Sequence, residues 1–348
     1  TKRYEFMASF CDNGEIAFSI NHMEVIPALL QIVDEILVNA IDHHQNSMKT
    51  KCPVKNVSME FDKETGKITI YNDGNGIPIE KKGEEWTPEL CVGHLLTSSN
   101  YNDKEERLVG GRNGFGAGLA NIWSTEFSLE TLWVHPENGN VQLYKQKWSN
   151  NMKIKGKPKI KDDKRKNGFT KISFVPDYDR FGIQKTFFDS FECLLLRRLC
   201  DVAATTALNV KYNKKKIVLK SSTASRSTTS LAAYGHLVGH TDNATHVKLG
   251  ERWECLVVIK PDVEEWPPIP SFVNGVRCDE KGPFVEIVEE KFIAALREKV
   301  KKQTKVDLKK SEIMKHVGII VNALVKNPRF SSQTKDKCTT KRSELGST

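Results

Sequence analysis

The sequence predicts an α/β protein of two domains, in which helices and strands alternate along the chain. Runs with apolar residues at helical spacing alternate with short β-branched runs. The 348 residues are enough for more than one hydrophobic core. A strand–helix–strand succession in the last third predicts a β-α-β unit. We expect a first domain over 1–205, a second over 215–340, and the start of a linker at 341–348.

The expected elements of the first domain follow from local periodicity. A broad apolar stripe at helical spacing predicts the first helix, and aromatic and aliphatic residues at the same spacing predict the last. Alternating β-branched runs predict strands, and a Lys-, Gly- and Asp-rich stretch predicts a surface loop. In order, these are a helix at 25–46, strands near 55–61 and 67–72, a polar segment at 80–106, a helix-to-strand stretch at 119–134, a strand at 141–148, the loop at 153–168, a strand at 169–175 and a helix at 184–208.

The second domain has a less regular beginning. Residues 220–246 are rich in Ser, Thr and Ala and favour no single element. Beyond them we expect strands at 252–260 and 270–277, a helix at 284–302 and a strand at 315–324. No internal repeat is visible.

Composition excludes several classes of protein. The chain is 39% hydrophobic and 28% charged, which is typical of a globular protein, and no apolar run is long enough to span a membrane. Its eight cysteines are scattered without a C-x-x-C pair, which favours free thiols over structural zinc. The net charge of +9 favours a polyanionic partner. We expect no membrane partner, because no apolar run is long enough. Lysines cluster at 153–166, 211–220 and 297–310, although such clusters are often only solvated loops.

Residues 110–118 contain five glycines in nine positions and lead into a helix-like run. Glycine at this density indicates backbone that approaches a ligand closely, and bare N–H groups before a helix favour anions such as phosphates. The segment is not a P-loop, because Ala117 and Gly118 stand where Lys and Ser or Thr are required. It therefore predicts a phosphate site of another class.

The first predicted helix carries three short polar side chains opposite its apolar stripe. Glu35, Asn39 and Asp42 follow one another at helical spacing with no Lys or Arg among them. A solvated face is the common explanation of such a pattern. A carboxylate that polarises water and a carboxamide oxygen that binds Mg²⁺ beside phosphates would also need this arrangement.

The strand at 67–72 ends in a D-G-x-G motif. Its glycines allow a flat ligand to lie against the backbone, and Asp73 can accept a hydrogen bond from an amino group such as that of adenine. By itself the motif is usually a turn. Together with the polar helix before it, and with the glycine-rich segment and the 168–174 strand after it, it predicts a nucleotide site.

This series of motifs resembles the GHKL ATPases, and most closely eukaryotic-type DNA topoisomerase II. The resemblance rests on the segments D-E-I-L-V-N-A at 34–40, G-H-L-L-T-S-S-N-Y at 93–101, G-G-R-N-G-F-G-A at 110–117 and S-S-Q-T-K at 331–335. It covers nearly the whole chain. It implies a two-layer α/β sandwich of the GHKL (Bergerat) type over 1–205, and a transducer domain with a β-α-β unit and the Q-T-K loop over 215–340.

The resemblance also implies the role of each residue. Glu35 would be the general base for attack of water on the γ-phosphate of ATP, Asn39 would hold Mg²⁺, Asp73 would bind the adenine amino group with support from Thr170, and Lys335 would contact the γ-phosphate. The nucleotide-binding set would be Asn39, Asp42, Asp73, Ile77, Ser98, Ser99, Asn100, Gly111, Arg112, Asn113, Gly114, Phe115, Gly116, Ala117, Thr170, Gln333 and Lys335.

The sequence departs from the family pattern at several points. Gly118 replaces a usual Lys, so we expect weaker nucleotide binding or slower hydrolysis than in a Lys-bearing relative. His43 replaces a frequent Asn, and we expect it at the surface. Most of the N-terminal arm that crosses to the partner subunit, the E-G-D-S-A metal motif and the strand-cleaving domain are not in this sequence, so we expect that this chain alone does not cut DNA.

The expected partners are double-stranded DNA, a second protomer bound on ATP binding, and cleavage domains of the same full-length chain. Lys301, Lys302 and Lys305 correspond to a Lys-rich loop that faces DNA in the family, and we expect phosphate contacts there. A nucleus is the expected compartment, with a mitochondrion, another DNA-containing organelle or a large DNA virus as alternatives. A GHKL chaperone, a mismatch-repair ATPase and a non-catalytic DNA-binding module remain alternative functions.

Overall fold

The computed structural model describes residues 2–94, 116–219, 230–239, 244–260 and 266–346. The chain divides into two compact units. The first holds residues 26–199 and 207–217, and the second holds 2–25, 200–206 and 218–348. The prediction assigned the whole N-terminal part of the chain, residues 1–205, to the first domain. In the structure the N-terminal residues 2–25 group with the second unit instead. Among the helices described here, none is long and apolar enough to cross a membrane.

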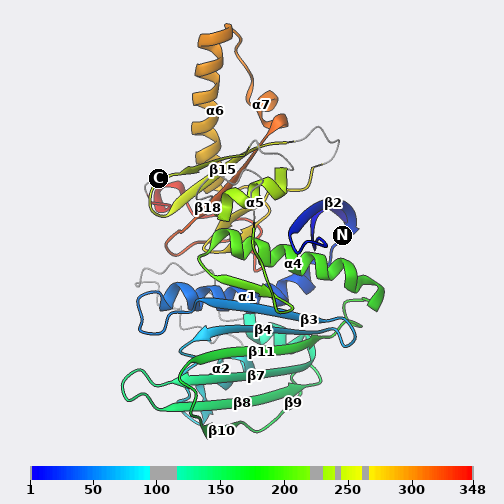
Figure 1. Cartoon of the computed structure of the whole chain (residues 1–348), viewed down its shortest axis with the longest axis vertical. Coiled ribbons are helices and arrows are strands. Elements are labelled where there is room, and N and C mark those ends of the chain that lie inside the picture. Colours follow the sequence, from blue (N-terminus) through cyan, green and yellow to red (C-terminus); the bar gives the residue numbers. More distant parts are fainter. Residues whose placement is uncertain (1, 95–115, 220–229, 240–243, 261–265, 347–348) are drawn as a thin grey trace. The chain divides into compact units, whose positions relative to one another are not determined.

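A nine-stranded sheet forms the centre of the first unit (Figure 1). Its strands follow the order β10-β8-β7-β11-β4-β3-β12-β13, with β9 paired to β8. All neighbours are antiparallel except β12 beside β3. The strands are β3 (Asn56–Asp62), β4 (Lys67–Gly74), β7 (Ser124–Val134), β8 (Val141–Ser149), β9 (Ile154–Lys155), β10 (Lys159–Asp162), β11 (Gly168–Pro176), β12 (Asn209–Tyr212) and β13 (Lys215–Lys216).

Helices cover one face of this sheet, which we call the inner face. Side chains alternate along β4, so that Ile68, Ile70 and Asn72 share the inner face. The ring of Phe191 in α4 packs edge-on against Phe61 of β3, with centroids 5.5 Å apart. The alternate residues of β4, Thr69, Tyr71 and Asp73, lie on the opposite face, which we call the outer face. The remaining elements of this unit are α1 (Pro27–Ser47), β5 (Lys81–Lys82), β6 (Glu85–Trp86), α2 (Thr87–Gly93), α3 (Gly116–Ile122), η1 (Lys185–Phe187) and α4 (Phe188–Thr205). Residues 200–205 of α4 group with the second unit.

The second unit is built on a five-stranded sheet of order β14-β15-β18-β16-β17. Strand β16 runs parallel to β18, and α6 lies between them in the chain, which confirms the predicted β-α-β unit. The elements are β1 (Lys2–Phe10), β2 (Ile16–Glu24), α5 (Ser230–Gly239), β14 (Ala244–Lys248), β15 (Trp253–Ile259), β16 (Ser271–Val273), β17 (Val276–Cys278), α6 (Pro283–Thr304), α7 (Lys310–His316), β18 (Val317–Ala323) and η2 (Arg342–Glu344).

The fold class and the long helices at 25–46, 184–208 and 284–302 are confirmed. The single strand expected at 270–277 is wrong, because Asn274 and Gly275 both adopt positive φ and turn the chain into a two-stranded hairpin. The loop expected at 153–168 is also wrong in part. Its residues 159–162 pair with β8 through backbone hydrogen bonds that the Lys-rich composition of the stretch does not reveal.

Candidate functional site

The carboxylate of Glu35 lies directly against the first residue of α3. A Cβ atom placed on Gly116 would lie 2.2 Å from Glu35 Oε2 and 3.0 Å from Glu35 Cβ. Glu35 is 4% exposed, and Gln31 Nε2 donates a hydrogen bond of 2.7 Å to its Oε1. A side chain at position 116 would therefore displace the Glu35 carboxylate, and the fold brings this acid to the glycine-rich segment.

Several predicted site residues lie outside the described part of the chain. Of the glycine-rich segment, the structure describes only Gly116, Ala117 and Gly118, all buried in α3. The residues outside it are Ser98, Ser99, Asn100, Gly111, Arg112, Asn113, Gly114 and Phe115.

The other predicted residues of α1 differ in exposure. Asn39 is exposed one turn beyond Glu35, and Asp42 is 7% exposed. The carboxylate of Glu35 and the carboxamide of Asn39 are hard oxygen donors one helical turn apart, so their chemistry fits Mg²⁺. His43 is partly buried rather than at the surface as expected, since it packs against the end of β4.

Asp73 turns away from these residues. Its position on β4 is on the outer face, where Oδ1 accepts hydrogen bonds from the backbone N–H groups of Lys55 (2.8 Å) and Asn56 (2.9 Å). Its Oδ2 accepts one from Asn56 Nδ2 at 2.5 Å. Both carboxylate oxygens thus anchor the start of β3. The geometry does not favour the predicted adenine contact of Asp73, because a ligand on the inner face lies across the sheet from it.

Asn72, which the motif did not single out, occupies the inner face instead. Its Nδ2 donates to the Asp73 carbonyl at 2.7 Å and lies 3.1 Å from His43 Nδ1. Burial lowers the pKa of His43, and the neighbouring His44 lowers it further although Asp73 opposes this. A neutral His43 accepts the amide proton at Nδ1. This arrangement leaves Asn72 Oδ1 as an acceptor that no hydrogen bond among the described residues uses.

Thr170 stands beside Asn72 on the same face. The two residues are direct partners in the register of β11 and β4, so their side chains are neighbours. Thr170 Oγ1 is buried and has no hydrogen-bond partner among the described residues. A buried hydroxyl without a partner is costly unless a ligand or water satisfies it. The free oxygen of Asn72 and this hydroxyl together can bind one polar edge of a ligand.

The D-G-x-G turn is held tightly against neighbouring strands. A Cβ atom on Gly76, where φ is 75°, would lie 2.1 Å from the Leu132 carbonyl oxygen. The N–H of Ile77 donates to Thr131 Oγ1 at 2.8 Å, and that hydroxyl donates to the Phe169 carbonyl at 2.9 Å. Thr131 therefore fixes the turn. Thr131 was not among the predicted site residues, because a Thr within an alternating strand gives no local sign of this role.

Helix α1 sets the length of the site. Glu35 and His43 are eight positions apart, which is about 12 Å along a helix axis. One end offers a carboxylate and glycine backbone, and the other offers the paired polar groups of Asn72 and Thr170. The arrangement suits an elongated ligand with a charged end and a hydrogen-bonding end.

The predicted Q-T-K loop belongs to the second unit. A β-bridge between Phe330 and Cys338 closes it, and the N–H of Ser331 donates to the Lys337 carbonyl at 3.0 Å. Lys335 adopts a left-handed φ of 58° and is 7% exposed. Gln333 is partly buried. The loop is therefore an ordered hairpin in its own unit.

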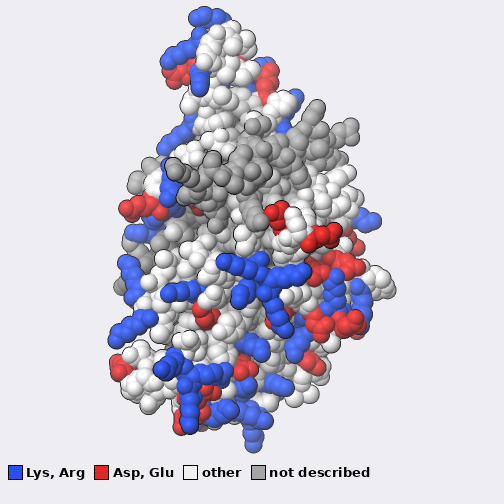
Figure 2. Space-filling model, viewed as in Figure 1, with Lys and Arg blue, Asp and Glu red and all other residues white. Residues whose placement is uncertain are grey.

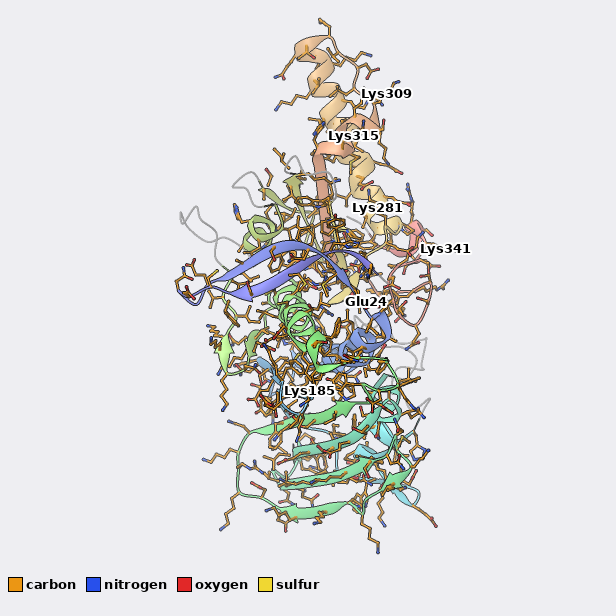
Figure 3. The ribbon with its side chains drawn as sticks, turned by 90° about the vertical axis from the view of Figure 1, so that its right-hand side faces the viewer. Glu24, Lys185, Lys281, Lys309, Lys315 and Lys341 are labelled. Atoms are coloured by element: carbon orange, nitrogen blue, oxygen red, sulfur yellow. The ribbon has the colours of Figure 1, made fainter. Side chains whose placement is uncertain are left out.

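The predicted DNA-contacting lysines lie at the C-terminal end of α6. The buried residues of this helix all precede residue 294, and Figure 1 shows its second half extending beyond the sheet of the second unit. Lys301 and Lys302 are in its last turn, and Lys305 ends it with a φ of 63°. Lys309 and Lys315 of the following segment lie beside the same helix in Figure 3.

Two family models match separate parts of the chain, one in each half. Residues 24–174 match the family model of histidine kinase-, DNA gyrase B- and HSP90-like ATPases, and residues 212–345 match the DNA gyrase B model. DNA topoisomerase 2 of Penicillium chrysogenum is 37% identical over 92% of this chain and 20% of its own length. Human DNA topoisomerase 2-alpha is 36% identical over 94% of this chain and 21% of its own length.

A solved structure covers the whole chain. The crystal structure of the ATPase region of Saccharomyces cerevisiae topoisomerase II superposes with a TM-score of 0.85 and 31% identity, over 100% of this chain and 86% of that one. The present chain spans about a fifth of the length of the curated relatives it matches.

Proposed function

Because this chain belongs to the ATPase region of the type II DNA topoisomerases, we propose that it binds ATP and hydrolyses it to ADP and phosphate. The observation that carries the proposal is the contact of the buried Glu35 carboxylate with Gly116 at the end of the glycine-rich segment. Purified protein with ATP and Mg²⁺ tests it by release of inorganic phosphate. Absence of release above background at saturating ATP would contradict the proposal.

The hydrolytic step needs one base and a positioned water. The water oxygen attacks the γ-phosphorus while Glu35 accepts a proton from that water. The bond between the γ-phosphorus and the β–γ bridging oxygen breaks, and ADP leaves. Gln31, bonded to Glu35 Oε1, holds that carboxylate in place. Asn39 would hold Mg²⁺, which neutralises phosphate charge when bound. Asp42, Ile77, Gly116 and Ala117, together with the predicted residues at 98–100 and 111–115, would line the nucleotide.

The adenine end is assigned to Asn72 in place of Asp73. Asn72 Oδ1 would accept a hydrogen bond from the adenine amino group, and Thr170 Oγ1 would bond the neighbouring ring edge. Asp73 keeps a structural role because its oxygens hold the start of β3. From the second unit, Gln333 and Lys335 would contact the γ-phosphate, so that its release could change the interdomain angle.

Replacing Asn72 by Ala is expected to weaken ATP binding by about tenfold, the usual cost of one lost hydrogen bond in a buried site. The preference for ATP over inosine triphosphate, which lacks the amino group, should disappear with it. Competition binding of both nucleotides measures the two effects. Asp73→Ala is the matched control, and it should lower thermal stability while the nucleotide preference persists. A loss of preference in Asp73→Ala alone would restore the original assignment.

In the full-length protein this region would act as an ATP-operated gate for passage of a DNA duplex. ATP binding would join two protomers, and cleavage domains of the same full-length chain would cut DNA. The nucleus is the proposed compartment, supported by eukaryotic relatives such as the human protein. We assign the α6 lysines to the passing duplex, since three exposed charges at the tip of a projecting helix suit phosphates.

Replacing Lys301, Lys302 and Lys305 by Ala is expected to reduce the stimulation of ATPase activity by DNA several-fold. The basal rate should stay unchanged, because these exposed side chains are not among the residues assigned to the nucleotide. Phosphate release with and without duplex DNA, measured over a range of salt concentrations, checks both statements. Equal stimulation in the variant and the parent would refute the DNA contact.

A further inference from the structure

The outer face of the nine-stranded sheet carries lysines in register on several strands. Lys159 of β10 is the direct partner of Lys145 in β8, and Lys171 of β11 lies in the same cross-strand row with Glu130 of β7 between them. Two positions along the strands, Lys161 and Lys147 extend the group on this same face. We call these five lysines the sheet-face lysines.

Most of the sheet-face lysines have no acidic partner. Lys145 pairs with Glu130 at 2.8 Å. Within the described residues, no ion pair involves Lys147, Lys159, Lys161 or Lys171. Figure 2 views this face and shows Lys and Arg side chains gathered over the lower strands of the sheet. In Figure 3 the cyan helices lie on one side of the strands, and side chains extend freely on the other.

Protection of a sheet edge accounts for only part of this pattern. Lysines on edge strands prevent pairing with other chains, and β10 is such an edge. Lys147 and Lys171 are on β8 and β11, which have neighbours on both sides. Unpaired charges in the interior of the sheet protect no edge, so they need another explanation.

The spacing of the sheet-face lysines suits a polyanion with regularly spaced charges. Neighbouring strands are about 4.8 Å apart, and alternate residues on one strand about 6.7 Å apart. On β7, between the lysine-bearing strands, this face carries Ser128 and Glu130. Its apolar residues Leu132, Leu143 and Phe169 form a small cluster and are at most 8% exposed. Its described residues form no apolar groove for the side chains of an acidic peptide. The stacked pair Tyr71–Phe169 is no platform for unpaired bases, because Phe169 is 8% exposed and Arg165 lies over its ring.

We propose that the sheet-face lysines form a second, sequence-independent binding surface for the phosphate backbone of duplex DNA. A basic face whose aromatic pair is covered in this way contacts phosphates and does not read bases. The choice of DNA among polyanions rests on the proposed function. The contact itself needs no nucleotide, so its test is separate from the test of ATP hydrolysis.

The test measures binding of a fluorescently labelled DNA duplex to the whole chain without nucleotide. Lys147→Ala, Lys159→Ala and Lys161→Ala together should weaken binding roughly tenfold or more at moderate salt and reduce the slope of log K against log salt by about 2.7, or 0.9 per phosphate contact. The matched control replaces the exposed Lys49, Lys51 and Lys82, which removes the same charge elsewhere in the unit. Equal losses in both variants would overturn the proposal.

Acetylation of lysines followed by mass spectrometry provides a second measurement. Duplex DNA should protect Lys147, Lys159, Lys161 and Lys171, while Lys49 and Lys51 stay reactive. Unchanged labelling of the sheet-face lysines would overturn the proposal even if the variants bind weakly. Stronger competition by polyglutamate than by duplex DNA would also overturn it, in favour of an acidic protein partner.

Discussion

Replacing Glu35 by Gln is expected to reduce ATP hydrolysis by a factor of roughly a hundred to ten thousand while ATP binding persists. The amide cannot accept the proton of the attacking water at neutral pH. It keeps the size of the side chain, which matters because Gly116 leaves no spare room beside it. Single-turnover phosphate release measures the chemical step, and equilibrium binding of ATP measures the affinity.

The control for Glu35→Gln is the same change at Glu60, an exposed residue on the outer face of β3. Glu60→Gln should leave both the rate and the affinity unchanged. Hydrolysis at the parental rate by Glu35→Gln would remove the general base from the mechanism. Loss of ATP binding along with hydrolysis would instead indicate that the carboxylate shapes the pocket.

Replacing Gly168 by Ala is expected to destabilise the first unit by about 3 kcal/mol or more. The new Cβ would lie 2.5 Å from the Gly74 carbonyl oxygen and 2.7 Å from that of Leu132. Both atoms belong to strands that pair with β11, so neither can move without breaking hydrogen bonds of the sheet. The melting temperature and the urea midpoint of the variant measure the loss.

Gly93→Ala is the matched control for Gly168→Ala. A Cβ there would meet its nearest atoms at 3.7 Å, an ordinary van der Waals distance, so the melting temperature should change little. Because Gly168 also supports the D-G-x-G turn, its variant should bind ATP more weakly in the residual folded population. Stability equal to that of Gly93→Ala would show that the strands accommodate the methyl group.

The choice between Asn72 and Asp73 at the proposed adenine end depends on the fold and not on the motif alone. The D-G-x-G motif begins at Asp73, and Asn72 directly precedes it; a carboxylate is the more obvious acceptor. Successive residues of a strand face opposite sides, so a difference of one position moves a side chain across the sheet. The register of β4 with β3 and β11 decides that Asn72 is inside and that Asp73 binds the backbone of residues 55 and 56.

Other differences have a similar cause. The lysine-rich stretch at 153–166 has no apolar period, and it becomes strand only because the edge of β8 offers hydrogen-bond partners. The hairpin Lys2–Glu24, which was not predicted, groups with the second unit through contacts distant in sequence. Local composition contains no information about such pairings.

By itself the sequence determined the fold class, the family and the long helices, because apolar periodicity and runs of specific motifs are local properties of the chain. It also placed Glu35 and Asn39 on one face of a helix, since helical spacing is fixed. Only the tertiary structure decided that Glu35 lies against Gly116, that Asn72 and not Asp73 shares a face with Thr170, and that lysines of separate strands form one surface. Those relations depend on strand register and packing between distant segments, which no local pattern specifies.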